Sequence, residues 1–231
     1  MSSIDAGLVL PDFLDTAAIM TGALTGAMHA RRKGLDFPGV FLVAVSTGVG
    51  GGLIRDVLLQ QGIPALFLNP AYQLYALIGS IVGVFFASVA ARLNTAYDAL
   101  DTFMIGAWVL LGCTKAQAAG LPSISVAFIG TIAAIGGGLL RDVLCNDPPQ
   151  IMLPGHFYAV SAFSAAITYV VLVSSSVPIS ACQIAAMAAA IITRVVSLHF
   201  DIVTPGPYDL SENVLQFLHL SRRTHANAID D

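Results

Sequence analysis

Two copies of one glycine-and-charge motif hold the residues best suited to do chemistry in this chain. The sequence VGGGLIRDVL occupies residues 49–58, and IGGGLLRDVL occupies residues 135–144. Each copy places an arginine and an aspartate just after a glycine triplet, inside an otherwise apolar stretch. An ionised side chain in hydrocarbon is costly unless it faces water or a partner, so each Arg-Asp pair is a candidate functional site.

Aspartates elsewhere in the chain are candidate partners for these arginines. Neighbouring residues on a helix point about 100° apart, so Arg55 and Asp56 are not expected to neutralise one another. Asp15 lies near the start of the first apolar stretch and Arg55 near the end of the second, which puts them at one level in antiparallel helices. By the same reasoning Asp101 and Arg141 meet at the opposite level. Two such pairs form the mouths of a pathway or act as structural ion pairs that set helix register.

The glycine triplets have two possible roles. Three residues without side chains weaken a helix, so we expect a kink or exposed backbone there, lining a pore constriction. The alternative is close helix packing, because small residues let membrane helices approach one another. Ser46 and Thr47 are expected to bond backbone groups that the glycines free. The candidate pathway residues are Gly50, Gly51, Gly52, Arg55, Asp56, Gly136, Gly137, Gly138, Arg141, Asp142, Asp15, Asp101, Ser46 and Thr47.

The remaining polar and aromatic residues suggest no catalytic chemistry. No nucleophile has a base and an orienting group in reach, and no His, Cys or Glu spacing matches a metal site, so neither an enzyme nor a cofactor is expected. The spacing G-x-G-x-x-G fails in both glycine segments. His29 and Lys115 end equivalent stretches and are expected to extend to the membrane interface. Trp108, Tyr72, Tyr158 and Tyr169 are expected to be interface anchors or core residues.

Composition places the chain in a membrane. Of 231 residues, 56% are hydrophobic and 10% are charged, and the mean hydropathy is +0.81. A soluble domain carries about 25% charged residues, so this chain has too little polar surface for water. The net charge is −4, and no basic stripe interleaves with aromatic residues, which excludes nucleic acid as a partner. Three cysteines in or beside apolar runs are read as packing residues.

Seven apolar stretches are long enough to cross the hydrocarbon core of a bilayer. They predict an all-α membrane protein of seven transmembrane helices with short connections. The predicted spans cover residues 11–30, 37–59, 71–93, 97–118, 122–144, 157–174 and 179–200. The tail that follows is polar except for residues 214–220 and is expected to be a tail or a surface helix.

An internal repeat organises these stretches. Arg55 and Arg141 are 86 residues apart, and the same offset aligns Gly34 with Gly120 and Tyr72 with Tyr158 without a gap. Each unit holds three spans, so the second unit enters the membrane from the opposite side, and the two are inverted. The predicted segments are repeat 1 at residues 1–93, inverted repeat 2 at 94–177, helix 7 at 178–200 and a polar tail at 201–231.

The positions of lysine and arginine orient the bundle. Arg31, Arg32 and Lys33 follow the first span, Arg92 follows the third, and two further arginines lie in the tail. Because Lys and Arg near span ends stay in the cytoplasm, we expect the N-terminus outside and the C-terminus inside.

The duplicated GGG-L-x-RD-VL motif in a seven-span chain resembles the prokaryotic branch of the trimeric intracellular cation (TRIC) channel family. The resemblance runs from about Phe13 to Phe200. It implies a homotrimer in membrane lipid, with an hourglass-shaped pore in each protomer that passes monovalent cations, mainly K⁺ and also Na⁺. It also implies glycine-kinked second and fifth spans at that pore, with the Arg-Asp pairs beside them. The Lys-Glu-Val segment of animal members is absent, so we expect a prokaryotic inner membrane.

Three functions remain open from the sequence. The leading hypothesis is a passive cation channel with carboxylates at its mouths and glycines at its narrowest point. A secondary transporter of a small solute is the alternative, since inverted repeats with broken helices also suit alternating access. A structural or assembly protein that packs through its glycine faces would pass no solute.

Overall fold

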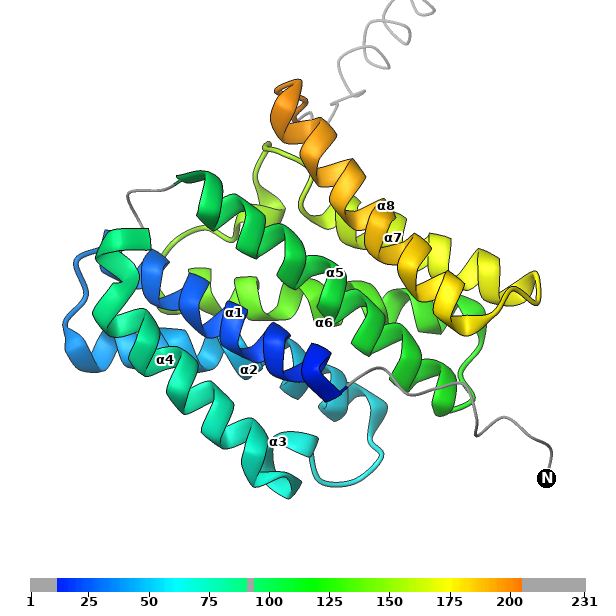
Figure 1. Cartoon of the computed structure of the whole chain (residues 1–231), viewed down its shortest axis with the longest axis horizontal. Coiled ribbons are helices and arrows are strands. Elements are labelled where there is room, and N and C mark those ends of the chain that lie inside the picture. Colours follow the sequence, from blue (N-terminus) through cyan, green and yellow to red (C-terminus); the bar gives the residue numbers. More distant parts are fainter. Residues whose placement is uncertain (1–11, 91–93, 205–231) are drawn as a thin grey trace, which may run out of the picture.

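A computed structural model of the chain describes residues 12–90 and 94–204, which form an all-helical bundle (Figure 1). Its long helices are α1 (Asp12–Arg32), α2 (Phe37–Leu59), α4 (Pro70–Ala90), α5 (Asn94–Ala118), α6 (Ser123–Leu144), α7 (Ala159–Ser174) and α8 (Ile179–His199). Each corresponds to one predicted apolar stretch. The sequence did not predict the short helix α3 (Ala65–Leu68) or the 3₁₀ turn η1 (Gln150–Met152). The N-terminal residues 1–11, the end of the third stretch with Arg92, and the tail beyond residue 204 lie outside the described residues.

The outer surface of the bundle suits a lipid environment. Four helical segments are long and apolar enough to cross a membrane: α2, residues 97–118 of α5, α6 and α8. Residues 70–86 of α4 and the whole of α7 are shorter apolar helices. Large apolar side chains face outward, among them Ile124 at 81% exposed and Ile184 at 72%. Such a surface is unfavourable in water, so the chain is an integral membrane protein.

Two helices end in the same way, 86 residues apart. Gly34 has φ +73° after α1, and Gly120 has φ +74° after α5. In the first turn the amide of Leu35 donates to the carbonyl of Ala30 at 3.3 Å, and in the second Leu121 donates to Ala116 at 3.2 Å. A left-handed glycine followed by this hydrogen bond is a Schellman cap. The aligned Gly-Leu pairs of the sequence therefore do the same structural job.

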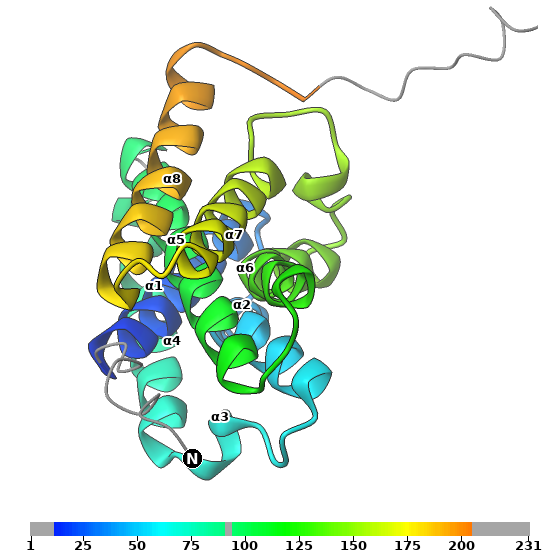
Figure 2. The same cartoon turned by 90° about the vertical axis from the view of Figure 1, so that its right-hand side faces the viewer.

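Helices α2 and α6 lie next to each other at the centre of the bundle. Helix α1 packs against α2 and α4, and α5 packs against α6, α7 and α8. Helices α7 and α8 lie together at one edge, and α4 with α3 lies at the other (Figures 1 and 2). Chain direction alternates along the bundle, so α2 and α6 end on opposite sides. We call these sides the Arg55 end, where α2 ends, and the Arg141 end, where α6 ends.

The contact between α2 and α6 consists of backbone against backbone at the glycine triplets. A Cβ atom on Gly51 would clash with the carbonyl oxygen of Ala133, and one on Gly137 would lie 2.5 Å from the carbonyl oxygen of Thr47. These two contacts are related by the 86-residue offset. Only glycine allows helices to approach this closely.

A second pair of contacts flanks the first. A Cβ atom on Gly50 would lie 2.6 Å from Leu140, and one on Gly136 would lie 2.9 Å from Ile54. This pair also follows the 86-residue offset, so the interface is reciprocal. The sequence-based expectation that the two triplets face each other is confirmed.

The triplets do not interrupt their helices. Both α2 and α6 are continuous through the glycines, and all six glycines are buried. Close packing, one of the two roles considered for them, is therefore present. The kink and the constriction remain proposals.

Substituting Gly51 with alanine should destabilise the protein. Alanine favours helix, but here its methyl group would overlap a backbone oxygen, and overpacking of this kind costs about 1–3 kcal/mol. Thermal unfolding in a mild detergent measures the loss. Gly155→Ala is the matched control, because only one atom lies within 4 Å of its Cβ position, at 3.8 Å. Equal melting temperatures for the two variants would contradict the close contact.

Candidate functional site

At the Arg55 end, Arg55 pairs with its own neighbour. Its Nε donates to Oδ1 of Asp56 at 2.7 Å, and its guanidinium lies 5.7 Å from the ring centre of Trp108. The second oxygen of Asp56 accepts the backbone N–H of Ala65, the first residue of α3, at 2.9 Å. Asp56 thus binds an arginine with one oxygen and holds a short helix with the other.

The predicted ion pair between Asp15 and Arg55 is wrong. Asp15 instead accepts a hydrogen bond from the hydroxyl of Tyr72 at 2.7 Å, and no ion pair joins Asp15 to Arg55 in the described part of the chain. The expectation that Arg55 and Asp56 would not neutralise each other also fails. A long arginine side chain bends back along the helix, and the Trp108 ring beside Gly52 supports it there. These groups enclose a cavity of about 20 Å³, enough for one water.

At the Arg141 end the same motif makes the same bonds. Arg141 donates through Nε to Oδ1 of Asp142 at 2.8 Å, and the other oxygen of Asp142 accepts the N–H of Gln150, the first residue of η1, at 2.9 Å. Arg141 also donates to the hydroxyl of Tyr97 at 2.8 Å. The predicted pair of Asp101 with Arg141 is confirmed as an ion pair of 3.8 Å. That distance is longer than a hydrogen bond.

Arg194 completes this cluster, and the sequence analysis missed it. Its NH2 lies 3.8 Å from Oδ2 of Asp101, and its guanidinium lies 5.4 Å from the ring centre of Tyr158. Asp101 is 1% exposed and sits between two arginines. The sequence does contain a signal for Arg194. It is an ionised residue within the last apolar stretch, and such a residue is a candidate functional site for the same reason as Arg55.

Charged residues near the helix ends link the two halves of the chain. Nζ of Lys115, in the last turn of α5, lies 3.4 Å from Oδ1 of Asp56, which follows the glycines of α2. Nε2 of His29, near the end of α1, lies 2.9 Å from Asp147, and Nζ of Lys33 lies 2.6 Å from the same carboxylate. Lys33, and then His29, lower the pKa of Asp147 below its ordinary value. Lys115 and His29 were expected only to reach the interface; they also form these cross-links.

The two remaining candidates lie on α2 beside the glycines. The Thr47 hydroxyl is buried and donates to the carbonyl of Val43 at 2.7 Å, one turn earlier in the continuous helix and not to a backbone group freed by the glycines. Its own carbonyl packs against Gly137. Ser46 is half-buried one position earlier.

A cavity with charged residues in its lining lies near each end of the α2–α6 contact. The cavity at the Arg55 end has a volume of about 260 Å³ and includes Asp56 and Lys115 in its lining. The cavity at the Arg141 end has a volume of about 270 Å³ and includes Tyr158 and Arg194. Packed glycines lie between the two charged clusters. The structure therefore brings the predicted residues together as two charged ends and a closed middle.

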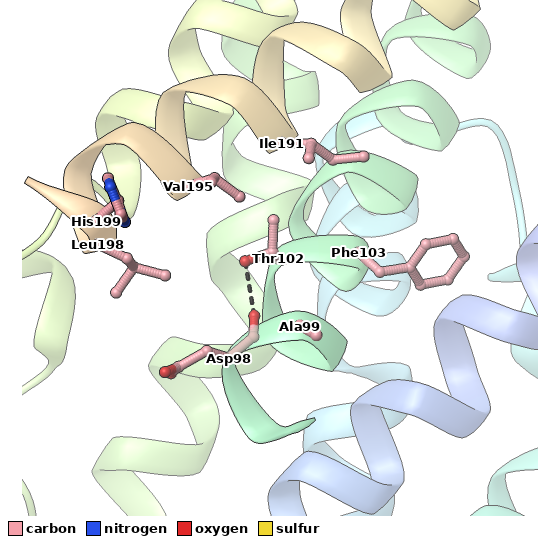
Figure 3. Close-up of a pocket in the computed structure, with 8 residues that line it drawn as sticks. All are labelled: Asp98, Ala99, Thr102, Phe103, Ile191, Val195, Leu198 and His199. Carbon is pink, nitrogen blue, oxygen red and sulfur yellow. Dashed lines mark hydrogen bonds between the residues drawn. The ribbon is translucent and has the colours of Figure 1, made fainter. Parts of the chain in front are cut away.

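A further cavity among the described residues does not belong to this arrangement. It is an apolar groove of about 570 Å³ between α5 and α8, and Figure 3 shows side chains from both helices facing it. The Thr102 hydroxyl there donates to the carbonyl of Asp98 at 2.6 Å, so it is bonded to its own helix. An apolar groove of this kind gives an ion no replacement for its hydration shell.

Comparison with known proteins gives consistent matches. A family model described as "Glycine transporter" matches residues 12–88 and again residues 98–174, so the two matches start 86 residues apart. A UPF0126 membrane protein of Deinococcus radiodurans is 31% identical over 67% of this chain and 72% of its own length. The UPF0126 inner membrane protein YadS of Escherichia coli K12 is 27% identical over 87% of this chain and 97% of its own length.

Solved structures of channels share the fold. A TRIC cation channel aligns with a TM-score of 0.80 at 27% identity, covering 87% of this chain and 98% of its own. The TRIC orthologue of Rhodobacter sphaeroides aligns with a TM-score of 0.77 at 29% identity, covering 82% and 97%. These structural neighbours are channels, and the UPF0126 relatives carry no enzyme name.

Replacing Asp101 with asparagine should destabilise the protein more than replacing Asp15, although the two positions are equivalent in the repeat. Asp101 is the buried counter-charge of two arginines, and removing one partner of such a pair costs about 3–5 kcal/mol. Asp15 is only half-buried and accepts a bond from a neutral tyrosine. Unfolding of Asp101→Asn and Asp15→Asn in detergent makes the comparison. Equal losses would show that Asp101 does not neutralise both arginines.

Proposed function

We propose that this chain, which belongs to the UPF0126 family of membrane proteins, is a passive channel for K⁺ and Na⁺. The "Glycine transporter" family model matches its sequence, and its fold is similar to that of TRIC channels. The observation that carries the proposal is the arrangement around α2 and α6. A cluster of arginine and aspartate and a cavity with charged residues in its lining lie near each end of their glycine contact. Carboxylates at a pore mouth raise the local concentration of cations.

The proposed pathway follows the α2–α6 interface through each protomer. A cation enters at one end beside Asp15, Arg55 and Asp56 and leaves at the other beside Asp101, Arg141 and Asp142. Between them, Ser46, Thr47 and the two glycine triplets surround the narrowest point, where backbone oxygens replace water around the ion. The packed glycines represent the closed pore, so opening requires α2 and α6 to separate or kink.

The proposed architecture consists of seven spans in two inverted three-helix units. Residues 1–93 and 94–177 are the units, 178–200 is the seventh span, and 201–231 is the tail. The contacts that recur with the 86-residue offset support this inversion, as does the doubled match of the family model. We further propose a homotrimer, because a solved neighbour is a trimeric intracellular cation channel.

The proposed location is a prokaryotic inner membrane, which is where the name of the E. coli relative places that protein. The N-terminus lies outside and the C-terminus in the cytoplasm. This orientation puts the cations Arg31, Arg32 and Lys33 on the cytoplasmic side, in line with the preference of lysine and arginine for that side.

A second candidate function is secondary transport of a small solute. The description of the family model favours it. The geometry favours it too, because two cavities separated by a closed middle suit alternating access. Glycine is the first solute to try. Transport requires that the two cavities never open together, whereas a channel conducts when they do.

Reconstitution into liposomes separates the two functions. For a channel we expect K⁺ flux that follows the electrochemical gradient and unitary currents in planar bilayers. For a transporter we expect saturable exchange of labelled glycine across the liposome membrane and no unitary current. Liposomes with Gly51→Ala and Gly137→Ala protein test the pathway, since both changes should alter K⁺ flux if it passes the glycine contact. K⁺ flux insensitive to both would place the pathway elsewhere.

Neutralising Lys115 should raise cation conductance. Lys115 lines the Arg55-end cavity, where its charge offsets Asp56 and repels a cation that enters. We expect Lys115→Gln to show a larger K⁺ current than the wild-type protein at low salt, and the difference should shrink at high salt because salt screens exposed charges. Lys115→Arg keeps the charge and should conduct like the wild-type protein. A Lys115→Gln current equal to wild type at low salt would remove this cavity from the pathway.

A further inference from the structure

Three residues that line the cavity at the Arg141 end carry a buried polar atom without a hydrogen-bond partner. Among the described residues, Nε of Arg194, the hydroxyl of Tyr158 and Nδ1 of His156 are buried polar atoms with no hydrogen-bond partner. All three residues line this cavity of about 270 Å³. Arg194 is 7% exposed and Tyr158 is 5% exposed. Buried polar groups normally have partners, so these atoms are suited to a ligand that accepts hydrogen bonds.

The charge of Arg194 is only partly balanced. Its NH2 lies 3.8 Å from Asp101, too far for a hydrogen bond, and Asp101 also faces Arg141 at 3.8 Å. Arg141 has a closer carboxylate of its own in Asp142, at 2.8 Å. A guanidinium carries five donors and favours carboxylate or phosphate oxygens. Arg194 therefore has both charge and donors available for an added anion.

The start of α7 strengthens the same preference. Tyr158 is its N-cap residue, and no side chain caps the helix. The first N–H groups of a 16-residue helix carry partial positive charge and favour an anion. This helix end, Tyr158 and Arg194 meet at one cavity.

The Arg55 end is different. Tyr72, the repeat equivalent of Tyr158, donates its hydroxyl to Asp15, and Arg55 donates to Asp56. The tyrosine hydroxyl that has no partner at the Arg141 end is thus bonded to a carboxylate at the other end.

We propose that the Arg141-end cavity binds a small oxyanion, a carboxylate or phosphate group, through the guanidinium of Arg194 and the hydroxyl of Tyr158. The site does not depend on which solute crosses the protein. The group comes either from a free solute or from the headgroup of an anionic lipid, since the chemistry is the same. Binding would draw Arg194 away from Asp101, leaving that carboxylate to Arg141 alone.

Thermal unfolding of the full-length protein in a non-ionic detergent tests the site with potassium acetate and potassium phosphate. At equal ionic strength we expect either salt to raise the melting temperature above that in potassium chloride, with a saturable dependence on concentration. Arg194→Gln should bind acetate about tenfold more weakly or worse, since a charge-assisted hydrogen bond is lost. Tyr158→Phe keeps the ring under Arg194 and should weaken binding by a smaller factor.

Matched variants and lipids complete the test. Lys33→Gln removes a cation outside this cavity, on the same side of the membrane, and should respond to acetate like the wild-type protein.

Added phosphatidylglycerol should compete with acetate if the natural ligand is a lipid headgroup, whereas phosphatidylcholine should not compete. If only acetate or phosphate acts, the ligand is a free solute. A wild-type protein that melts equally in acetate, phosphate and chloride would overturn the proposal, as would Arg194→Gln and Tyr158→Phe proteins that keep the full acetate response.

Discussion

The close approach of α2 and α6 is the constraint on which the rest of the molecule depends. In a membrane, helices do not associate to escape water, so association rests on packing, and packing is closest where side chains are absent. Gly51 and Gly137 each face a backbone carbonyl of the other helix. Because the two helices run in opposite directions, this contact at their middles sends one Arg-Asp pair to each side of the bundle. The distribution of charge follows from the glycine contact.

Each Arg-Asp pair also holds the loop that follows its helix. One oxygen of Asp56 or Asp142 binds the adjacent arginine, and the other binds the first N–H of the short helix in the loop that follows. Hydrogen bonds to its free lone pairs stabilise a buried ion pair, and here the loop supplies one to the second oxygen of each aspartate. The loops after α2 and α6 are thereby tied to the helix ends.

The two ends differ most at the second aspartate of each unit. Asp15 accepts a tyrosine hydroxyl, whereas Asp101 lies between Arg141 and Arg194 and keeps an oxygen without a hydrogen bond. The contacts that recur 86 residues apart are therefore alike at the two ends, and Arg194 of α8 adds a charge at one of them. Unequal ends suit a protein whose two faces meet different solutions, whether ions flow passively or a solute is exchanged.

The sequence by itself determined the all-helical membrane fold, the long helices of the described residues, the 86-residue offset and the facing glycine triplets. These features depend on hydropathy, helix length and repetition, which local sequence records directly. Only the tertiary structure decided that Arg55 would bind its neighbour, that Asp15 would accept from Tyr72, and that Arg194 would join Asp101. A long side chain chooses its partner by the space around it, and that space is set by residues far away in the chain, such as the Trp108 ring beside Arg55.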